Sequence, residues 1–127
     1  MKSFNAHLLQ LVDTTKQILL LPNREGFDLV RTYDICYVEA ARAYCTLYFF
    51  NGQSLLVSKP LKEIAAQLHS KRFFRVHHSY LVNISAVQRI VKNDGEALEL
   101  LDGKHIPLAQ RRREAFLRFV STKGRRS

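Results

Sequence analysis

The sequence predicts a single domain of mainly β structure with two or three short helices. Three observations support this fold class. The chain has 127 residues, its apolar residues form short runs rich in β-branched and aromatic side chains, and turn-forming residues separate these runs. At 46% hydrophobic residues, a chain of this length can bury a substantial core. The separators Asn51-Gly52, Asp94-Gly95 and Asp102-Gly103 tolerate the positive φ of tight hairpins, so we expect antiparallel pairing of consecutive strands.

The expected strands, in chain order, cover residues 17–21, 27–31, 35–39, 44–50, 54–58, 73–77, 80–83, 86–91, 97–101 and 105–108. In residues 44–50 both alternating sets of side chains are largely apolar. A strand of this kind is typically covered on both faces. The sequence therefore predicts more than one layer of sheet.

Two internal segments show helical periodicity. In residues 60–68 apolar side chains recur every three or four residues, with Ser58 as the expected N-cap and Pro60 in the first turn. The second segment, residues 110–120, begins with Gln110, continues with three arginines at 111–113 and ends in an apolar set. Residues 1–16 are either a linker or an N-terminal helix, and residues 123–127 are expected to form a disordered basic tail. The apolar side of the N-terminal segment would be Phe4, Leu8, Leu11 and Val12.

The positive charge is concentrated in the second half of the chain. The formal net charge is +9; residues 1–60 carry 6 basic and 5 acidic side chains, whereas residues 61–127 carry 14 and 6. A one-sided positive field attracts a polyanion such as nucleic acid, although it also serves solubility. No segment is both strongly amphipathic and basic, so a membrane surface fits poorly. Because we find neither a signal peptide nor an apolar run near the roughly 20 residues of a membrane span, the cytoplasm is the expected compartment.

The sequence shows no recognisable set of catalytic residues. Cys36 and Cys45 lie in apolar runs, where a free cysteine behaves as a small hydrophobe. His77 and His78 are adjacent on an expected strand end and point different ways, and no Cys-x-x-Cys or His-x-x-x-His spacing is present. A cysteine nucleophile would lack an oxyanion motif and a phosphate loop. We therefore expect no enzyme, no metal and no cofactor.

Five segments in order resemble one family. Residues 72–83 read Arg-Phe-Phe-Arg-Val-His-His-Ser-Tyr-Leu-Val-Asn, and residues 102–109 read Asp-Gly-Lys-His-Ile-Pro-Leu-Ala, followed by Arg111-Arg112. Together with residues 19–27, 34–48 and 61–64, they resemble the LytTR family, the β-rich output domain of many bacterial response regulators. The resemblance covers about residues 17–120, so we expect the domain to span residues 17–122. It implies an elongated, multi-sheet antiparallel fold that lies along double-stranded DNA.

The resemblance implies three base-reading loops. In the first loop Arg42 is the candidate, because its guanidinium can address guanine O6 and N7 together, and Tyr44 or Cys45 occupies the family's inserting position. For Tyr44 we favour core packing. The second loop offers His78, whose charge near neutral pH depends on its environment. The third offers Arg111, which aligns with the family's C-terminal contact residue.

Phosphate contacts are expected from basic and polar residues around these loops. Arg75 and Ser79 flank the histidines, and Arg112 and Arg113 follow Arg111. Three arginines oppose the dipole of a helix start, which is understandable if they face phosphates. Diffuse contacts are expected from Lys59, Arg89, Lys71 and Arg72.

The family further implies imperfect direct repeats occupied by two copies of the domain, with bending of the DNA. Response regulators of this type also have an upstream receiver domain. The chain has neither the length nor the clustered acidic residues of one, so we expect an excised output domain or a protein consisting of this domain alone.

The alternative is a basic β module that binds RNA or a protein partner. RNA readers rely on exposed aromatic side chains that stack on unpaired bases. Here the aromatics Phe49, Phe50, Phe73 and Phe74 lie in apolar runs and are expected in the core. Equal competition by DNA and single-stranded RNA for one site would favour this alternative.

Overall fold

The computed structural model describes residues 17–92 and 94–124. Within them ten strands form three antiparallel sheets, which confirms the predicted fold class. All ten predicted strands are present, with ends within two residues of the prediction. A hairpin pairs β1 (Ile18–Asn23) with β2 (Gly26–Arg31), and the central sheet has the order β5 (Ser54–Val57), β4 (Tyr44–Phe49), β3 (Ile35–Ala41), β7 (Tyr80–Asn83) and β6 (Phe73–His77). The third sheet has the order β10 (His105–Pro107), β9 (Glu96–Leu100) and β8 (Val87–Lys92).

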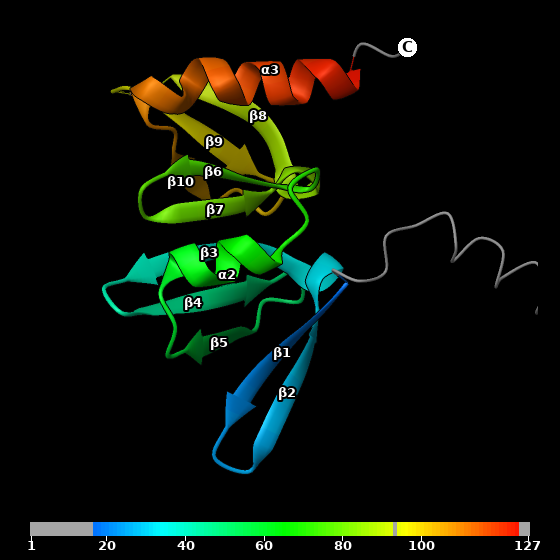
Figure 1. Ribbon diagram of the computed structural model, residues 1–127. Coiled ribbons are helices and arrows are strands. Elements are labelled where there is room, and N and C mark those ends of the chain that lie inside the picture. The colour runs from blue at the N-terminus through cyan, green and yellow to red at the C-terminus, as the bar shows by residue number, and fades with distance from the viewer. Residues whose placement is uncertain (1–16, 93, 125–127) are drawn as a thin grey trace, which may run out of the picture.

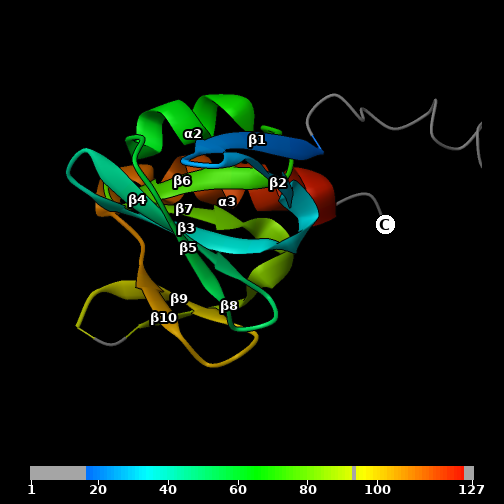
Figure 2. The ribbon, with the colours of Figure 1, turned by 90° about the horizontal axis from the view of Figure 1, so that it is seen from below.

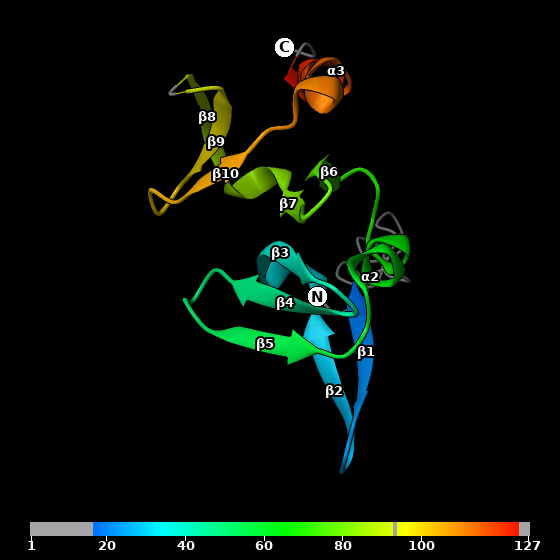
Figure 3. The same cartoon turned by 90° about the vertical axis from the view of Figure 1, so that its left-hand side faces the viewer.

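The three sheets form an elongated stack, with the β1–β2 hairpin at one end and α3 (Arg113–Gly124) at the other (Figure 1). The hairpin runs across the direction of β4 and β5 (Figure 3). Seen from below, α2 (Leu61–Gln67) and the β8–β10 sheet project to opposite sides of the stack (Figure 2).

The central sheet is covered on both faces, as predicted from the apolar pattern of residues 44–50. One buried cluster joins this sheet to the hairpin and α2, through side chains such as Leu19, Leu47 and Ile64. The other joins the opposite face to the third sheet and α3, through Val82, Leu98 and Phe116. Alternation along each strand sends successive side chains into the two clusters, so one sheet supports two cores.

Local geometry confirms the expected hairpin turns. Gly52, Gly95 and Gly103 have positive φ, as the three hairpin separators require. A register shift between Arg75 and His77 marks a β-bulge at the end of β6. A bulge bends the strand and re-aims its side chains, so it shapes the turn that follows.

Four local predictions are wrong. Helix α2 begins after Pro60 with no side-chain cap, so Ser58 is not its N-cap. The segment from residue 110 starts as the 3-10 turn η4 (Gln110–Arg112), and the α-helix begins only at Arg113. That helix continues to Gly124, so residues 123 and 124 are not part of a tail. Phe50 is exposed because it lies in the β4–β5 turn rather than on the strand.

The predictions for residues 1–16 and 125–127 fall outside the described residues. Two further 3-10 turns, η2 (Thr32–Asp34) and η3 (Ile84–Ala86), complete the described elements. No helix in the described part of the chain is long and apolar enough to cross a membrane.

Candidate nucleic-acid interface

Three connections lie in a row along one edge of the stack, seen at the left of Figure 1: the β3–β4 turn, the β6–β7 turn and the link from β10 through η4 to α3. We call residues 42–44, 77–79 and 109–112 the turn edge. Backbone hydrogen bonds join them, because Ala40 N–H donates to Ser79 O (2.8 Å) and Ala109 N–H donates to Val76 O (2.9 Å). The relative positions of the three connections are therefore set by the main chain.

The β3–β4 turn presents Arg42. Ala41 pairs with Tyr44, which leaves Arg42 and Ala43 as a two-residue turn, and Arg42 has a φ of 61°. A side chain in this left-handed region costs roughly 1–2 kcal/mol relative to ordinary backbone, and glycine is the usual occupant. The exposed Arg42 thus occupies a backbone position where glycine would give a more stable turn. An outlier of this kind motivates a functional hypothesis for its side chain.

Tyr44 and Cys45, the two candidates for insertion into DNA, have opposite environments. Tyr44 is 47% exposed at the start of β4, so the prediction of core packing is wrong. Cys45 is 0% exposed, and burial raises its thiol pKa to about 11. The prediction that Cys45 reads bases is wrong, because strand alternation turns its side chain into the core.

The β6–β7 turn is held by side chains. The guanidinium of Arg75 donates to two backbone carbonyls, His77 O from Nε (3.1 Å) and His78 O from Nη2 (2.5 Å). Ser79 N–H donates to Nδ1 of His77 (3.1 Å), and the two imidazoles stack with centroids 4.5 Å apart. His78 is exposed, whereas Arg75, His77 and Ser79 are half-buried. The turn therefore has a defined shape that aims His78 outward.

Burial lowers the pKa of His77, and the nearby His78, Arg112 and Arg75 lower it further. A neutral imidazole is also what the hydrogen bond from Ser79 requires, since Nδ1 must then act as an acceptor. Burial, followed by repulsion from Arg112, likewise lowers the pKa of Arg75. Local positive charge is thus crowded on this side of the stack.

The three arginines after Gln110 differ in their surroundings. Arg111 is exposed. Arg112 is half-buried, with Nη1 3.4 Å from Arg75 O, while its buried Nε has no hydrogen-bond partner among the described residues. Arg113 donates from Nε to Glu96 Oε1 (2.6 Å), a bond that raises the pKa of Arg113. This internal carboxylate partner argues against the predicted phosphate contact for Arg113.

An open cleft of about 670 Å³ adjoins the turn edge. Its walls come from His77, from the β8–β9 turn, from residues 107–110 and from Arg113. Glu96 also lines it, so the pairing with Arg113 neutralises a carboxylate next to the edge. The described residues contain no group of three histidine, cysteine or acidic side chains that could hold a metal ion.

Comparison with known proteins identifies this arrangement. The sequence model of the LytTR DNA-binding domain family matches residues 25–121, more than half of the chain. The chain belongs to the LytTR DNA-binding domain family.

One known sequence and one solved structure are similar to this LytTR domain. An uncharacterized response regulatory protein of Vibrio cholerae serotype O1 is 28% identical over 109 residues, which cover 80% of this chain and 42% of that protein. The chain thus spans about two fifths of that relative's length. A solved LytTR domain from Bacillus cereus, described as part of a methyl-accepting/DNA response regulator, superposes with a TM-score of 0.68 at 20% identity, covering 82% of this chain and 96% of that one. The superposition shows that this chain has the LytTR fold.

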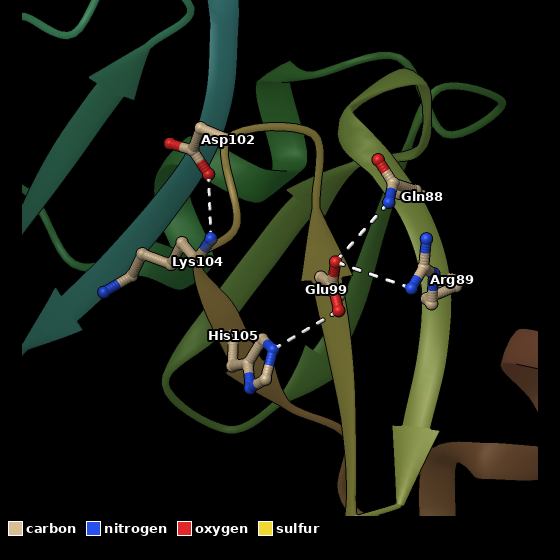
Figure 4. A network of polar contacts seen from close by, with 6 residues as sticks. All are labelled: Gln88, Arg89, Glu99, Asp102, Lys104 and His105. Carbon is tan, nitrogen blue, oxygen red and sulfur yellow. Dashed lines mark hydrogen bonds and ion pairs between the residues drawn. The ribbon is translucent and has the colours of Figure 1, made fainter.

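Two predicted phosphate contacts of the LytTR domain have acidic neighbours away from the three turns. Arg89 lies on β8, where Figure 4 shows it sharing Glu99 with Gln88 and His105; the Arg89–Glu99 ion pair measures 3.9 Å. Lys59 precedes α2 and lies 3.8 Å from Glu63. Both are partly exposed, and neither is fixed at the turn edge.

Some of the predicted DNA-contact residues therefore lie together on the turn edge, and others lie elsewhere. Arg42, Tyr44, His78 and Arg111 are exposed on it. Sequence reasoning missed that Arg75 ties the second turn and that Glu96 engages Arg113. No pattern in the sequence marks these roles, because they depend on the bulge in β6 and on the meeting of β9 with α3.

Proposed function

We propose that this LytTR domain reads double-stranded DNA in a sequence-specific manner through its turn edge, as the output domain of a two-component response regulator that controls bacterial transcription in the cytoplasm. The observation that carries the proposal is the row of three connections, joined by backbone hydrogen bonds and each exposing a donor side chain. Donors presented from loops on a rigid scaffold suit readout of DNA grooves.

Base contacts are assigned to Arg42, His78 and Arg111. Each is exposed, and each comes from a different connection. An arginine fork can address guanine O6 and N7, and a good bidentate pair provides about 1–3 kcal/mol of discrimination. Tyr44, beside Arg42, supplies an exposed ring that can approach a base step or the sugar.

Phosphate contacts are assigned to Ser79 and Arg112 beside the base readers, with Lys59 and Arg89 as longer-range contributors. Arg75 is assigned a different role, because its guanidinium already donates to two carbonyls of the β6–β7 turn. It shapes the turn rather than binding the backbone of DNA. The excess of basic residues after residue 60 supports attraction of the duplex.

Two copies are proposed to occupy imperfect direct repeats, with bending of the DNA between them. An elongated domain that lies along the duplex places equivalent turns in successive grooves, so repeat spacing should follow the helical repeat of about 10 bp. The response-regulator assignment is supported by the Vibrio cholerae relative, in which the aligned region is less than half of the protein.

In vitro selection from random duplex DNA, with bulk competitor at near-physiological salt, tests this proposal. We expect enrichment of a short motif repeated one or two helical turns apart. Arg111→Ala should then weaken binding to the selected site by about 10- to 100-fold, the loss of one base contact. Arg24→Ala is the matched control, because it removes the same charge from an exposed residue in the β1–β2 turn, away from the turn edge and from the expected DNA contacts.

The selection can also reject the proposal. If the domain retains all DNA sequences equally, binding depends on positive charge alone and the domain does not recognise sequence. Equal competition by single-stranded RNA would favour the RNA-binding alternative. An Arg111→Ala variant that binds the selected site as tightly as the Arg24→Ala control would remove Arg111 from the base readers.

A further inference from the structure

The outer face of the β1–β2 hairpin is apolar and uncovered. The inner face packs Leu19, Leu21 and Val30 into the core. On the outer face Ile18, Leu20, Phe27 and Leu29 are 42%, 50%, 59% and 58% exposed. Leu20 pairs with Leu29, and Phe27 pairs with Pro22, so these side chains adjoin one another across the two strands. We call these four residues the hairpin outer face.

This pattern differs from that of a sheet with one solvated face. Such a sheet alternates apolar and polar side chains, whereas residues 18–21 are apolar on both sides of the strand. This pattern indicates that a further apolar element covers the outer face. None of the described residues does so.

We propose that residues 1–16 of the same chain dock on the hairpin outer face through Phe4, Leu8, Leu11 and Val12. The segment leads directly into β1, and Gln17 is tied to the end of β2, because Thr32 N–H donates to Gln17 O (2.8 Å). The segment therefore starts beside Ile18, at one end of the apolar face.

The proposed helix and the hairpin outer face have similar lengths. The four side chains recur at positions i, i+4, i+7 and i+8, the spacing of one face of a helix. A helix over residues 1–12 would be about 18 Å long at 1.5 Å per residue. A strand of six residues spans about 20 Å. The helix must lie back over β1, so the chain has to reverse its direction between them. Residues 13–16 are enough for this, since helix–strand connections commonly take 2–6 residues.

The size of the patch favours this occupant over a second copy. Four half-exposed side chains amount to on the order of a few hundred Å² of apolar surface. A stable protein–protein interface needs about 800 Å² per partner. A short amphipathic helix, in contrast, is marginal in water and gains its stability from a packing surface of this kind. The proposed contact thus removes the outer face of the hairpin from water and stabilises the short helix.

A paramagnetic label tests the docking directly. In the full chain, a nitroxide is attached at Ala6→Cys, which on the proposed helix would lie on the side opposite to Leu8 and Leu11. The native thiols do not compete, because Cys36 and Cys45 are buried and burial raises the pKa of each to about 11. The NMR signals of Leu20 and Leu29 methyl groups should broaden strongly. Those of Leu117 in α3, at the other end of the stack, should not.

Matched variants separate apolar docking from mere proximity along the chain. Leu8→Gln with Leu11→Gln should abolish the broadening at Leu20 and Leu29, whereas Leu9→Gln, off the apolar side, should preserve it. Broadening that persists in the double variant overturns the proposal.

A mixed sample tests the second copy as occupant. Isotope-labelled chains without nitroxide are combined with unlabelled chains that carry it. Broadening of Leu20 and Leu29 in this mixture would show that the segment docks between chains, and it would overturn the proposal. DNA selection is independent of this result, so failure of the docking leaves the proposed function standing.

Discussion

The β3–β4 and β6–β7 turns lie side by side on the turn edge but are held in different ways. The first is a two-residue turn closed by the Ala41–Tyr44 pair, with its one strained residue, Arg42, exposed. The second is tied by Arg75 through two carbonyls and by His77 through Ser79 N–H. Backbone conformation sets the aim of Arg42, whereas a side-chain network sets the aim of His78. The two turns should therefore respond to different substitutions.

The largest effect is expected from Arg75→Ala, which removes the tie of the β6–β7 turn. Hydrogen bonds to charged groups contribute about 1.5–3 kcal/mol, so affinity for the selected DNA site should fall by 10-fold or more. The slope of log K against log salt should stay near that of the unmodified chain, because Arg75 shapes the turn and binds no phosphate. DNA titrations at several salt concentrations measure both quantities.

Arg75→Lys sharpens this prediction, because a lysine lacks the planar fork that serves two carbonyls and should restore little of the affinity. A phosphate-binding role would look different. Each lost phosphate contact lowers the salt slope by about 0.9, so a drop of that size in Arg75→Ala would contradict the assignment.

Arg42→Gly tests the backbone-held turn. Glycine relieves the positive φ, so the free energy of unfolding should rise by up to about 1 kcal/mol while DNA affinity falls. Chemical denaturation measures the first effect and DNA titration the second. Ala43→Gly is the control, since Ala43 lacks a positive φ and glycine there brings no such relief. Equal stabilisation by both substitutions would show that strain at Arg42 is not the cause.

The network-held turn should respond to pH through His77. Its pKa is lowered in the folded chain by burial and by neighbouring positive groups, so the unfolded chain binds the proton more readily. Stability is therefore expected to decrease as the pH falls through the ordinary histidine pKa of about 6.5. His77→Gln should flatten this dependence, measured as the melting temperature from pH 7.5 to 5.5. A dependence of unchanged steepness would mean that other groups cause it.

The smallest effect is expected from Glu96→Gln, next to the turn edge. Loss of the carboxylate releases Arg113 from its 2.6 Å contact and removes a negative charge near the DNA. Affinity for DNA should rise slightly and the salt slope should steepen, because a cation becomes free for phosphate. Asp94→Asn, which removes an exposed carboxylate from the same cleft, is the control. An equal rise in both variants would indicate general charge rather than release of Arg113.

Much of the fold could be predicted from the sequence, because it follows from local periodicity. The apolar pattern of residues 44–50 predicted cover on both faces of the central sheet, and two buried clusters provide it. Turn residues with positive φ marked the hairpins. The predictions that failed concern element ends, at Ser58 and in η4, where a difference of one or two residues changes which side chain caps or begins a helix.

The turn edge was less accessible to sequence reasoning. Motif position alone indicated Arg42, His78 and Arg111, and all three are exposed on it. The opposite environments of Tyr44 and Cys45 could not be predicted, because a strand whose two faces are both apolar does not reveal which one meets the larger core.

The sequence by itself thus determined the β-rich class, the two-sided cover of the central sheet and the positions that carry basic side chains. These depend on residue type and on spacings of a few residues. Only the tertiary structure decided what each arginine does. Arg111 faces solvent, Arg75 ties a turn and Arg113 is neutralised by Glu96, 17 residues earlier in the chain. Charge belongs to a residue, but the availability of that charge depends on the partners that the fold brings within hydrogen-bonding distance.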